Sequence, residues 1–165
     1  MSTPRRALYA GSFDPPTKGH LWIAQEGARL FDELVVVVAQ NPTKPVRTPI
    51  EEREALMRQC CAHLPNVEVR RFDGHYLVHV AAAVGAQYLL RGLRNPADFA
   101  YEQTLRNLNR DLVPAVETVF LVTPRELAEV SSSTVRALVG FAGWEELVAR
   151  FVPEPVLRRL VGGRS

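Results

Sequence analysis

The sequence predicts an α/β fold: a single Rossmann-like domain with a five-stranded parallel sheet, helices on both faces and a short helical tail at the C-terminus. Three observations lead to this prediction. Short apolar runs alternate along the chain with longer segments of helical periodicity, which is typical of βαβ units. No segment with the composition of a linker interrupts the alternation. The 165 residues suffice to bury one core, so residues 1–165 are expected to form one domain.

The first half of the chain contains three predicted strands and two predicted helices. The apolar run at residues 7–10 indicates a buried parallel strand, and apolar residues at helical spacing predict a helix over 21–31. The run at 34–39 is almost purely β-branched and too short for a buried helix, which predicts a central strand. Thr48-Pro49-Ile50-Glu51 combines an N-cap residue, an early proline and a glutamate three residues after the cap, so a helix should follow to about residue 64. Alternation over 67–72 predicts the third strand.

The alternation continues with helices and strands of similar length. We expect a short helix over residues 77–84 that Gly85 ends, and a fourth strand over 88–90. A helix over 98–112 and a fifth strand over 118–122 follow.

The last part of the chain is expected to be helical. Three consecutive serines at 131–133 predict the N-cap of a helix that carries Val135 and Leu138. Residues 144–160 predict two further short helices with a hinge near Pro153.

Composition and charge exclude several classes of protein. The 47% hydrophobic and 23% charged residues are ordinary for a globular protein, and a net charge of +2 without a basic run argues against a nucleic-acid partner. The chain begins without the apolar region of a signal peptide and has no apolar stretch near the ~20 residues that a bilayer requires, so we expect a cytoplasmic protein without membrane contact. The adjacent Cys60 and Cys61 fit neither a disulfide framework nor ligand spacing. His75 and His79 lack a third ligand nearby, so no metal site is predicted.

The turn after the first strand carries the strongest functional signal. Gly11 allows a ligand to approach the backbone, and Gly19-His20 lies where the first helical N–H groups favour an anion. His20 could then donate to a phosphate oxygen. The segment contains neither G-x-x-x-x-G-K-[ST] nor G-x-G-x-x-G. The alternative interpretation is a plain βα turn with a capping histidine.

Polar and cationic residues follow the other predicted strands. Lys44 follows the second strand, Arg91 and Arg94 follow the fourth, and the three serines follow the fifth. In an open parallel sheet, ligands bind outside the carboxyl ends of the strands, so these groups should share one edge. Such a set without a protein nucleophile suits nucleotidyl transfer, in which an acceptor phosphate attacks the α-phosphorus of a nucleoside triphosphate and pyrophosphate leaves. The alternative interpretation is that Lys44 is simply solvated and that the arginine after the fourth strand merely pairs with Glu102.

Two segments resemble a known family. The run Tyr9-Ala10-Gly11-Ser12-Phe13-Asp14-Pro15-Pro16-Thr17-Lys18-Gly19-His20 resembles the nucleotidyltransferase signature, with Ser12 where threonine is usual. The block Arg91-Gly92-Leu93-Arg94 with Asp98-Phe99-Ala100-Tyr101-Glu102 resembles bacterial phosphopantetheine adenylyltransferases, and the similarity spans residues 7–136. That resemblance implies transfer of AMP from ATP to 4′-phosphopantetheine, giving dephospho-coenzyme A and pyrophosphate with Mg²⁺ in coenzyme A biosynthesis. It also implies a homohexamer.

The resemblance further implies a role for each matching residue. It places His20, Lys44, Arg94 and Ser12 in catalysis. It implies that the nucleotide is bound by Ser12, Phe13, His20, Gly92, Leu93, Arg94, Glu102, Leu127, Ala128, Glu129, Val130, Ser131, Ser132 and Ser133. It implies that 4′-phosphopantetheine is bound by Ser12, Lys44, Leu77, Arg91, Tyr101 and Asn109.

The sequence departs from the family pattern around the serines. Leu127-Ala128-Glu129-Val130 replaces an aromatic-rich run, and Arg136-Ala137 replaces a Lys-Glu pair. These changes touch adenine packing and an acceptor contact. Two alternatives therefore stay open: an adenylyltransferase whose acceptor is nicotinate mononucleotide, and a nucleotide-binding module without catalysis.

Overall fold

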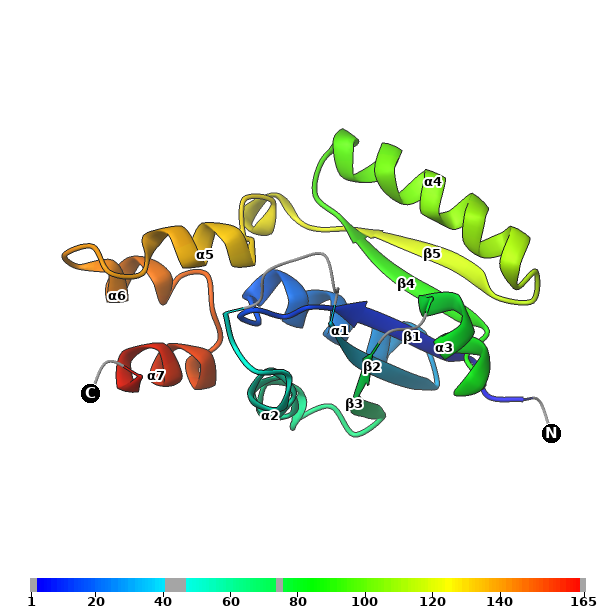
Figure 1. Ribbon diagram of the computed structural model, residues 1–165, viewed down its shortest axis with the longest axis horizontal. Coiled ribbons are helices and arrows are strands. Elements are labelled where there is room, and N and C mark those ends of the chain that lie inside the picture. Colours follow the sequence, from blue (N-terminus) through cyan, green and yellow to red (C-terminus); the bar gives the residue numbers. More distant parts are fainter. Residues whose placement is uncertain (1–2, 41–46, 74–75, 164–165) are drawn as a thin grey trace.

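A computed structural model describes residues 3–40, 47–73 and 76–163 of the chain (Figure 1). In the described residues, five strands alternate with four α-helices as the sequence predicts, and three further α-helices follow the last strand. In chain order the elements are β1 (Arg6–Gly11), α1 (Lys18–Leu30), β2 (Glu33–Gln40), α2 (Ile50–Cys61), β3 (Val67–Asp73), α3 (Leu77–Ala83), β4 (Tyr88–Leu93), α4 (Pro96–Leu112), β5 (Glu117–Val122), the 3₁₀ turn η1 (Arg125–Leu127), α5 (Ser132–Leu138), α6 (Trp144–Val148) and α7 (Glu154–Gly162).

The sheet is parallel throughout, with strand order β3-β2-β1-β4-β5. The chain builds outward from β1 to β3, then returns to place β4 on the other side of β1. The strand order therefore reverses between β1 and β4, where Tyr9 lies opposite Leu90 in the register. Open sheets of this kind bind ligands beside such a reversal, outside the carboxyl ends of the strands. The predicted fold class is confirmed.

Helices cover both faces of the sheet. On one face, Ile23 and Ala24 of α1 and Met57 of α2 pack against Val36 and Leu90 of the sheet. On the other face, Val78, Val80 and Ala81 of α3 pack against Leu8, Val37 and Leu89. The middle parts of the three inner strands are buried on both faces, which explains why residues 7–10, 34–39 and 89–90 are apolar without polar alternation.

The C-terminal helices form a third cluster on the outside of α2. Val135, Trp144, Val148 and Val156 bury their side chains against Leu56, among others. Arg159 of α7 and Glu52 of α2 form an ion pair at 2.5 Å. α6 and α7 are the two short helices predicted for the tail, and Pro153 is the N-cap residue of α7.

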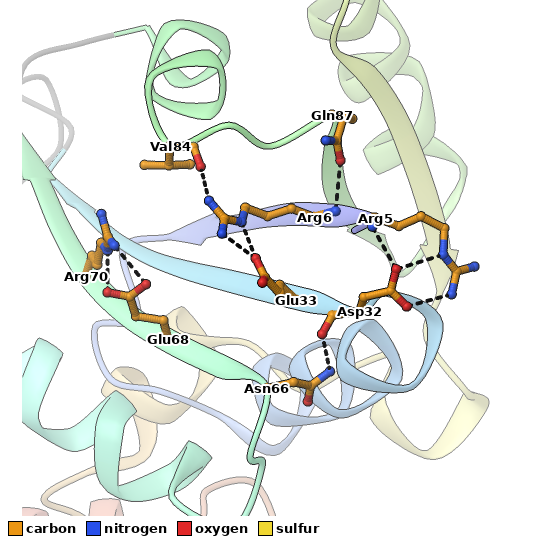
Figure 2. A network of polar contacts seen from close by, with 9 residues as sticks. All are labelled: Arg5, Arg6, Asp32, Glu33, Asn66, Glu68, Arg70, Val84 and Gln87. Atoms are coloured by element: carbon orange, nitrogen blue, oxygen red, sulfur yellow. Dashed lines mark hydrogen bonds and ion pairs between the residues drawn. The ribbon is translucent and has the colours of Figure 1, made fainter. Parts of the chain in front are cut away.

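Polar contacts tie the amino ends of the strands together, at the end of the sheet opposite the nucleotide edge predicted above (Figure 2). Asp32 accepts hydrogen bonds from the main chain and the side chain of Arg5, at 2.7 and 3.1 Å. Arg6 pairs with Glu33 and donates to the carbonyl of Val84 at 2.6 Å. Asn66 donates to the carbonyl of Phe31 at 3.1 Å, which joins β3 to the end of α1. Exposed pairs of this kind contribute little energy each, about 0–1 kcal/mol, so their main effect is to fix where the strands begin.

Three expectations about element ends are wrong. β4 does not stop at Leu90 but runs to Leu93, because Arg91, Gly92 and Leu93 pair with β5. The helix α2 begins after Pro49, which is its N-cap residue and makes no side-chain cap, so Thr48 does not cap it. That helix also ends at Cys61 rather than near residue 64. Among the helices that the structure describes, none is long and apolar enough to cross a membrane.

Candidate active site

A cavity of about 340 Å³ opens at the carboxyl ends of β1 and β4, where the strand order reverses. Four segments line it: the end of β1 with the first turn of α1, the end of β4 with the start of α4, the residue after β5, and the segment before α5. The lining residues are Tyr9, Ala10, Gly11, Ser12, Thr17, Gly19, His20, Ile23, Arg91, Gly92, Arg94, Asp98, Glu102, Thr123, Leu127, Val130, Ser131 and Ser132.

His20 lies in the first turn of α1 and is held by a capping box. Thr17 is the N-cap residue, and its hydroxyl accepts from the main-chain N–H of His20 at 3.3 Å. In return, Nδ1 of His20 accepts from the main-chain N–H of Thr17 at 3.1 Å. Since Nδ1 is an acceptor, the proton of the neutral ring is assigned to Nε2. The side chain therefore presents an N–H donor rather than a basic nitrogen.

The surroundings keep this imidazole neutral. Phe13 packs edge-on against it at a centroid distance of 5.0 Å, and only part of the ring faces the cavity. Burial, together with the smaller effect of the positive charge of Arg94, lowers the pKa of His20 to about 4. His20 is thus a neutral hydrogen-bond donor at neutral pH.

Arg91 and Glu102 form a two-point ion pair on the cavity wall. Nε of Arg91 lies 2.8 Å from Oε2 of Glu102, and Nη2 lies 2.6 Å from Oε1. Nη1 of Arg91 also donates to the carbonyl of Ala10 at 3.2 Å. Burial by itself would lower the pKa of Arg91, but the hydrogen bond and the charge of Glu102 raise it, so the guanidinium stays charged. The pair fixes a positive group between the ends of β1 and β4.

Arg94 and Asp98 form a second pair at the start of α4. Asp98 accepts from the main-chain N–H and from Nε of Arg94, both at 3.0 Å, and from Nη2 at 3.3 Å. Asn95 caps the helix by accepting from the N–H of Asp98 at 2.9 Å. Burial opposes the charged form of Asp98, but the bonds from Arg94 lower its pKa overall. The guanidinium of Arg94 is consequently held at the cavity rim.

The segment before α5 closes the cavity from the third side. Ser131 is the N-cap residue of α5 and accepts from the N–H of Thr134 at 3.0 Å, as the serine run predicts. Ser132 donates to the carbonyl of Pro15 at 2.8 Å, which joins this segment to the turn after β1. Thr123 is buried and donates to the carbonyl of Leu93 at 3.1 Å.

The structure brings ten of the predicted site residues to the cavity wall: Ser12, His20, Arg91, Gly92, Arg94, Glu102, Leu127, Val130, Ser131 and Ser132. Phe13 lies beneath the wall and is fully buried, and Leu93 is buried as well. The remaining described residues of the predicted set do not line the cavity: Leu77, Tyr101, Asn109, Ala128, Glu129 and Ser133. Lys44 lies outside the described residues.

Eight lining residues were not predicted as site residues: Tyr9, Ala10, Gly11, Thr17, Gly19, Ile23, Asp98 and Thr123. Asp98 could have been found, because a carboxylate four residues after an arginine at a helix start is a recognisable pair. Tyr9 and Thr123 carry no such signal, since they resemble ordinary strand and loop positions. Among the described residues, no group of three or more His, Cys, Asp or Glu side chains could hold a metal ion.

Comparison with known proteins places the chain in a family. The family model "Cytidylyltransferase-like" matches residues 8–138. A phosphopantetheine adenylyltransferase of Chromobacterium violaceum is 46% identical over 95% of this chain and 96% of its own length. One from Neisseria meningitidis is 45% identical over 97% of this chain and 94% of its own length, and one from Caldanaerobacter subterraneus is 43% identical.

A solved structure supports the same assignment at the level of the fold. The lipopolysaccharide core biosynthesis protein of Thermoplasma volcanium matches 72% of this chain and 97% of its own with a TM-score of 0.55 and 26% identity. The near-full-length identity to the named relatives and the donor-lined cavity at the strand reversal agree. The chain therefore belongs to the phosphopantetheine adenylyltransferases, within the cytidylyltransferase-like family.

Proposed function

We propose that the chain transfers the adenylyl group of ATP to 4′-phosphopantetheine, giving dephospho-coenzyme A and pyrophosphate in the cytoplasm. An oxygen of the acceptor phosphate forms a bond to the α-phosphorus of ATP, and the bond from that phosphorus to the pyrophosphate oxygen breaks in line. The observation that carries the proposal is identity of about 45% to phosphopantetheine adenylyltransferases over nearly the whole chain.

The chemistry requires donors more than a base. The reacting phosphorus gains no covalent partner from the protein, so catalysis depends on positioning and on neutralising the oxygens around it. His20 supplies a neutral Nε2–H from the floor of the cavity. Arg94 supplies a cation at the rim, and Ser12 a hydroxyl at the end of β1. We assign the stabilisation of the transition state to these three side chains and to Lys44.

Arg91 is assigned to the acceptor phosphate. Its guanidinium is fixed between Glu102 and the carbonyl of Ala10, which leaves one N–H on each of its two terminal nitrogens for a ligand. A pre-positioned arginine loses little conformational entropy when it binds a phosphate. Glu102 thus acts on the acceptor through Arg91, while its place on the wall also suits the adenosine side of the nucleotide.

The nucleotide is assigned to the opposite wall of the cavity. Gly92 packs closely on Ile23: an added Cβ would lie 2.9 Å from Cδ1 of Ile23, so a larger residue at this point of the wall would displace that side chain. Leu127 and Val130 offer apolar contact for adenine, and Ser131 and Ser132 lie at the start of α5 for the outer phosphates. Leu93, Ala128, Glu129 and Ser133 belong to the same two segments. The pantetheine arm is assigned to Leu77, Tyr101 and Asn109, which lie away from this cavity.

Mg²⁺ is expected to enter with the ATP. The carboxylates on the cavity wall, Asp98 and Glu102, both bind arginines in the described structure, and phosphate oxygens with water are the usual ligands of nucleotide-bound Mg²⁺. We therefore propose Mg²⁺–ATP as the co-substrate.

The outer surface of α4 supports a homo-oligomer, which we propose is a hexamer. Four large apolar side chains of this helix are exposed: Phe99, Tyr101, Leu108 and Leu112. Val122, at the end of the edge strand β5, is 71% exposed. Tyr101, Leu108 and Leu112 recur at helical spacing and so share one side of α4, and exposed large apolar side chains gathered in this way are normally covered by another chain.

The test is release of pyrophosphate from ATP with a panel of acceptors. We expect rapid release with 4′-phosphopantetheine and none with pantetheine, which lacks the attacking phosphate. Release with nicotinate mononucleotide and with no other acceptor would show that nicotinate mononucleotide is the acceptor. No release with any acceptor, combined with ATP binding, would identify a nucleotide-binding module instead.

A further inference from the structure

The turn between β1 and α1 contains a strained residue. Phe13 has a φ of 47°, and among the described residues it is the one residue other than glycine with positive φ. A bulky side chain rarely adopts this backbone conformation, so the surroundings must hold it. The ring is fully buried and packs edge-on against Tyr9 at 5.5 Å and His20 at 5.0 Å. Ser12, which lines the cavity, directly precedes this residue.

The carbonyls on both sides of Phe13 are bound by arginines. Nη1 of Arg53 donates to the carbonyl of Ser12 at 2.5 Å, and Nη1 of Arg136 donates to the carbonyl of Asp14. The two arginines come from different helices, α2 and α5, which are far apart in the sequence. The turn is therefore held at two points, the carbonyls of Ser12 and Asp14.

Arg53 is the more deeply placed of the two. Its side chain is 0% exposed, which is rare for arginine and requires hydrogen bonds in compensation. It also donates to the carbonyl of Ala39, at the end of β2, at 3.2 Å, and to that of Thr48, before α2, at 2.9 Å. One guanidinium thus joins the carboxyl ends of β1 and β2 and the start of α2.

We propose that Arg53 and Arg136 are positioning residues for adenylyl transfer, an inference that rests on the proposed function. They hold the carbonyls of Ser12 and Asp14 and so keep the Phe13 backbone in its strained form. Because the C=O and N–H of a trans peptide point in opposite directions, the Phe13 N–H is turned away from Arg53. The clamp fixes the Ser12 hydroxyl and the His20 ring, against which Phe13 packs, relative to the reacting phosphorus.

The kinetic test uses Arg136→Met, Arg136→Lys and Arg53→Met, with Arg58→Met as the matched control. Arg58 lies on α2 and also donates to a carbonyl, that of Val69 at 3.0 Å, but remote from the turn. We expect Arg136→Met to lower kcat about 10- to 100-fold, because small displacements of reacting groups are costly. KM for both substrates should stay within about threefold, since ground-state binding is not the target. Arg136→Lys should recover most of kcat. A KM effect alone, or an equal loss of kcat in Arg58→Met, would overturn the proposal.

A second measurement does not depend on turnover. Hydrogen exchange of the amides of Ser12, Phe13, Asp14 and Thr17 in the free protein should be at least about tenfold faster in Arg136→Met than in the wild type or Arg58→Met. Unchanged exchange there would overturn the clamp whatever the substrate proves to be. If the wild type lacks turnover but exchange rises as expected, the proposed function fails and the clamp stands. Because Arg53→Met risks misfolding, Arg136→Met decides the question.

Discussion

Replacing His20 tests the neutral-donor mechanism directly. His20→Ala removes the Nε2–H and, with it, the side-chain half of the capping box. The loss of one preorganised donor to a developing oxyanion costs about 3–4 kcal/mol in the barrier, so kcat should fall about 10²- to 10³-fold. Binding of ATP should stay within about threefold, because the donor acts on the transition state. Pyrophosphate release measures kcat, and isothermal titration measures ATP binding.

His20→Gln separates the cap from the chemistry. Glutamine is a preferred residue at this position of a capping box, so it can accept from the Thr17 N–H as the imidazole does. We expect His20→Ala to lose about 1 kcal/mol of folding stability through the cap, and His20→Gln to lose little of it. Both variants should lose kcat. A loss of kcat that followed the melting temperature would mean that the histidine acts only as a cap.

The pH dependence gives the sharpest outcome. With a pKa of about 4, the ring of the wild type stays neutral down to about pH 5, so its contribution should not titrate near 6.5. The ratio of wild-type to His20→Gln kcat cancels the ionisation of the substrate phosphates. It should be constant from pH 8 to about 5.5. A ratio that halves near pH 6.5 would refute the assignment of a neutral ring.

Three other predictions concern the remaining cavity groups and the surface. The pKa of His20 is near 6.5 in the unfolded chain and about 4 in the folded chain. The neutral ring therefore makes its full contribution to the free energy of unfolding above pH 6.5, and this contribution falls by up to about 3 kcal/mol as the pH drops to 4. Urea unfolding measures this change. Glu102→Gln breaks a largely buried ion pair and should cost about 3 kcal/mol of stability. It should raise KM for 4′-phosphopantetheine more than it raises KM for ATP. An equal rise in the two KM values would contradict the assignment of Arg91. Leu108→Glu should dissociate the oligomer in light scattering, whereas Val161→Glu, a comparably exposed apolar site on α7, should not.

The sequence predicted the fold and the main cavity because both depend on local patterns. Continuous apolar runs marked the inner strands, and glycines, a histidine and serines at helix starts marked segments that line the cavity. The length of β4 could not be predicted in this way. Arg91 and Gly92 have the composition of a loop, and only their pairing with Phe120 and Leu121 of β5 makes them a strand.

The partners of the cavity residues were harder to predict than the residues themselves. Arg53 occupies an ordinary helical position in the sequence, and its contact with Ser12 joins residues 41 positions apart. Arg136 and Asp14 are 122 positions apart. Contacts at such separation depend on how the helices pack around the sheet, and the sequence pattern of one element does not contain that information.

The helix α4 links two surfaces of the protein that are otherwise separate. Its one buried residue, Glu102, forms the ion pair with Arg91, and Asp98 near its beginning forms the ion pair with Arg94. The same helix also exposes the large apolar side chains of Tyr101, Leu108 and Leu112. A neighbouring subunit that packed on α4 would thus contact the helix that carries both carboxylates. A tilt of α4 on assembly would displace both guanidiniums together, so the same substitutions should affect subunit contacts and turnover.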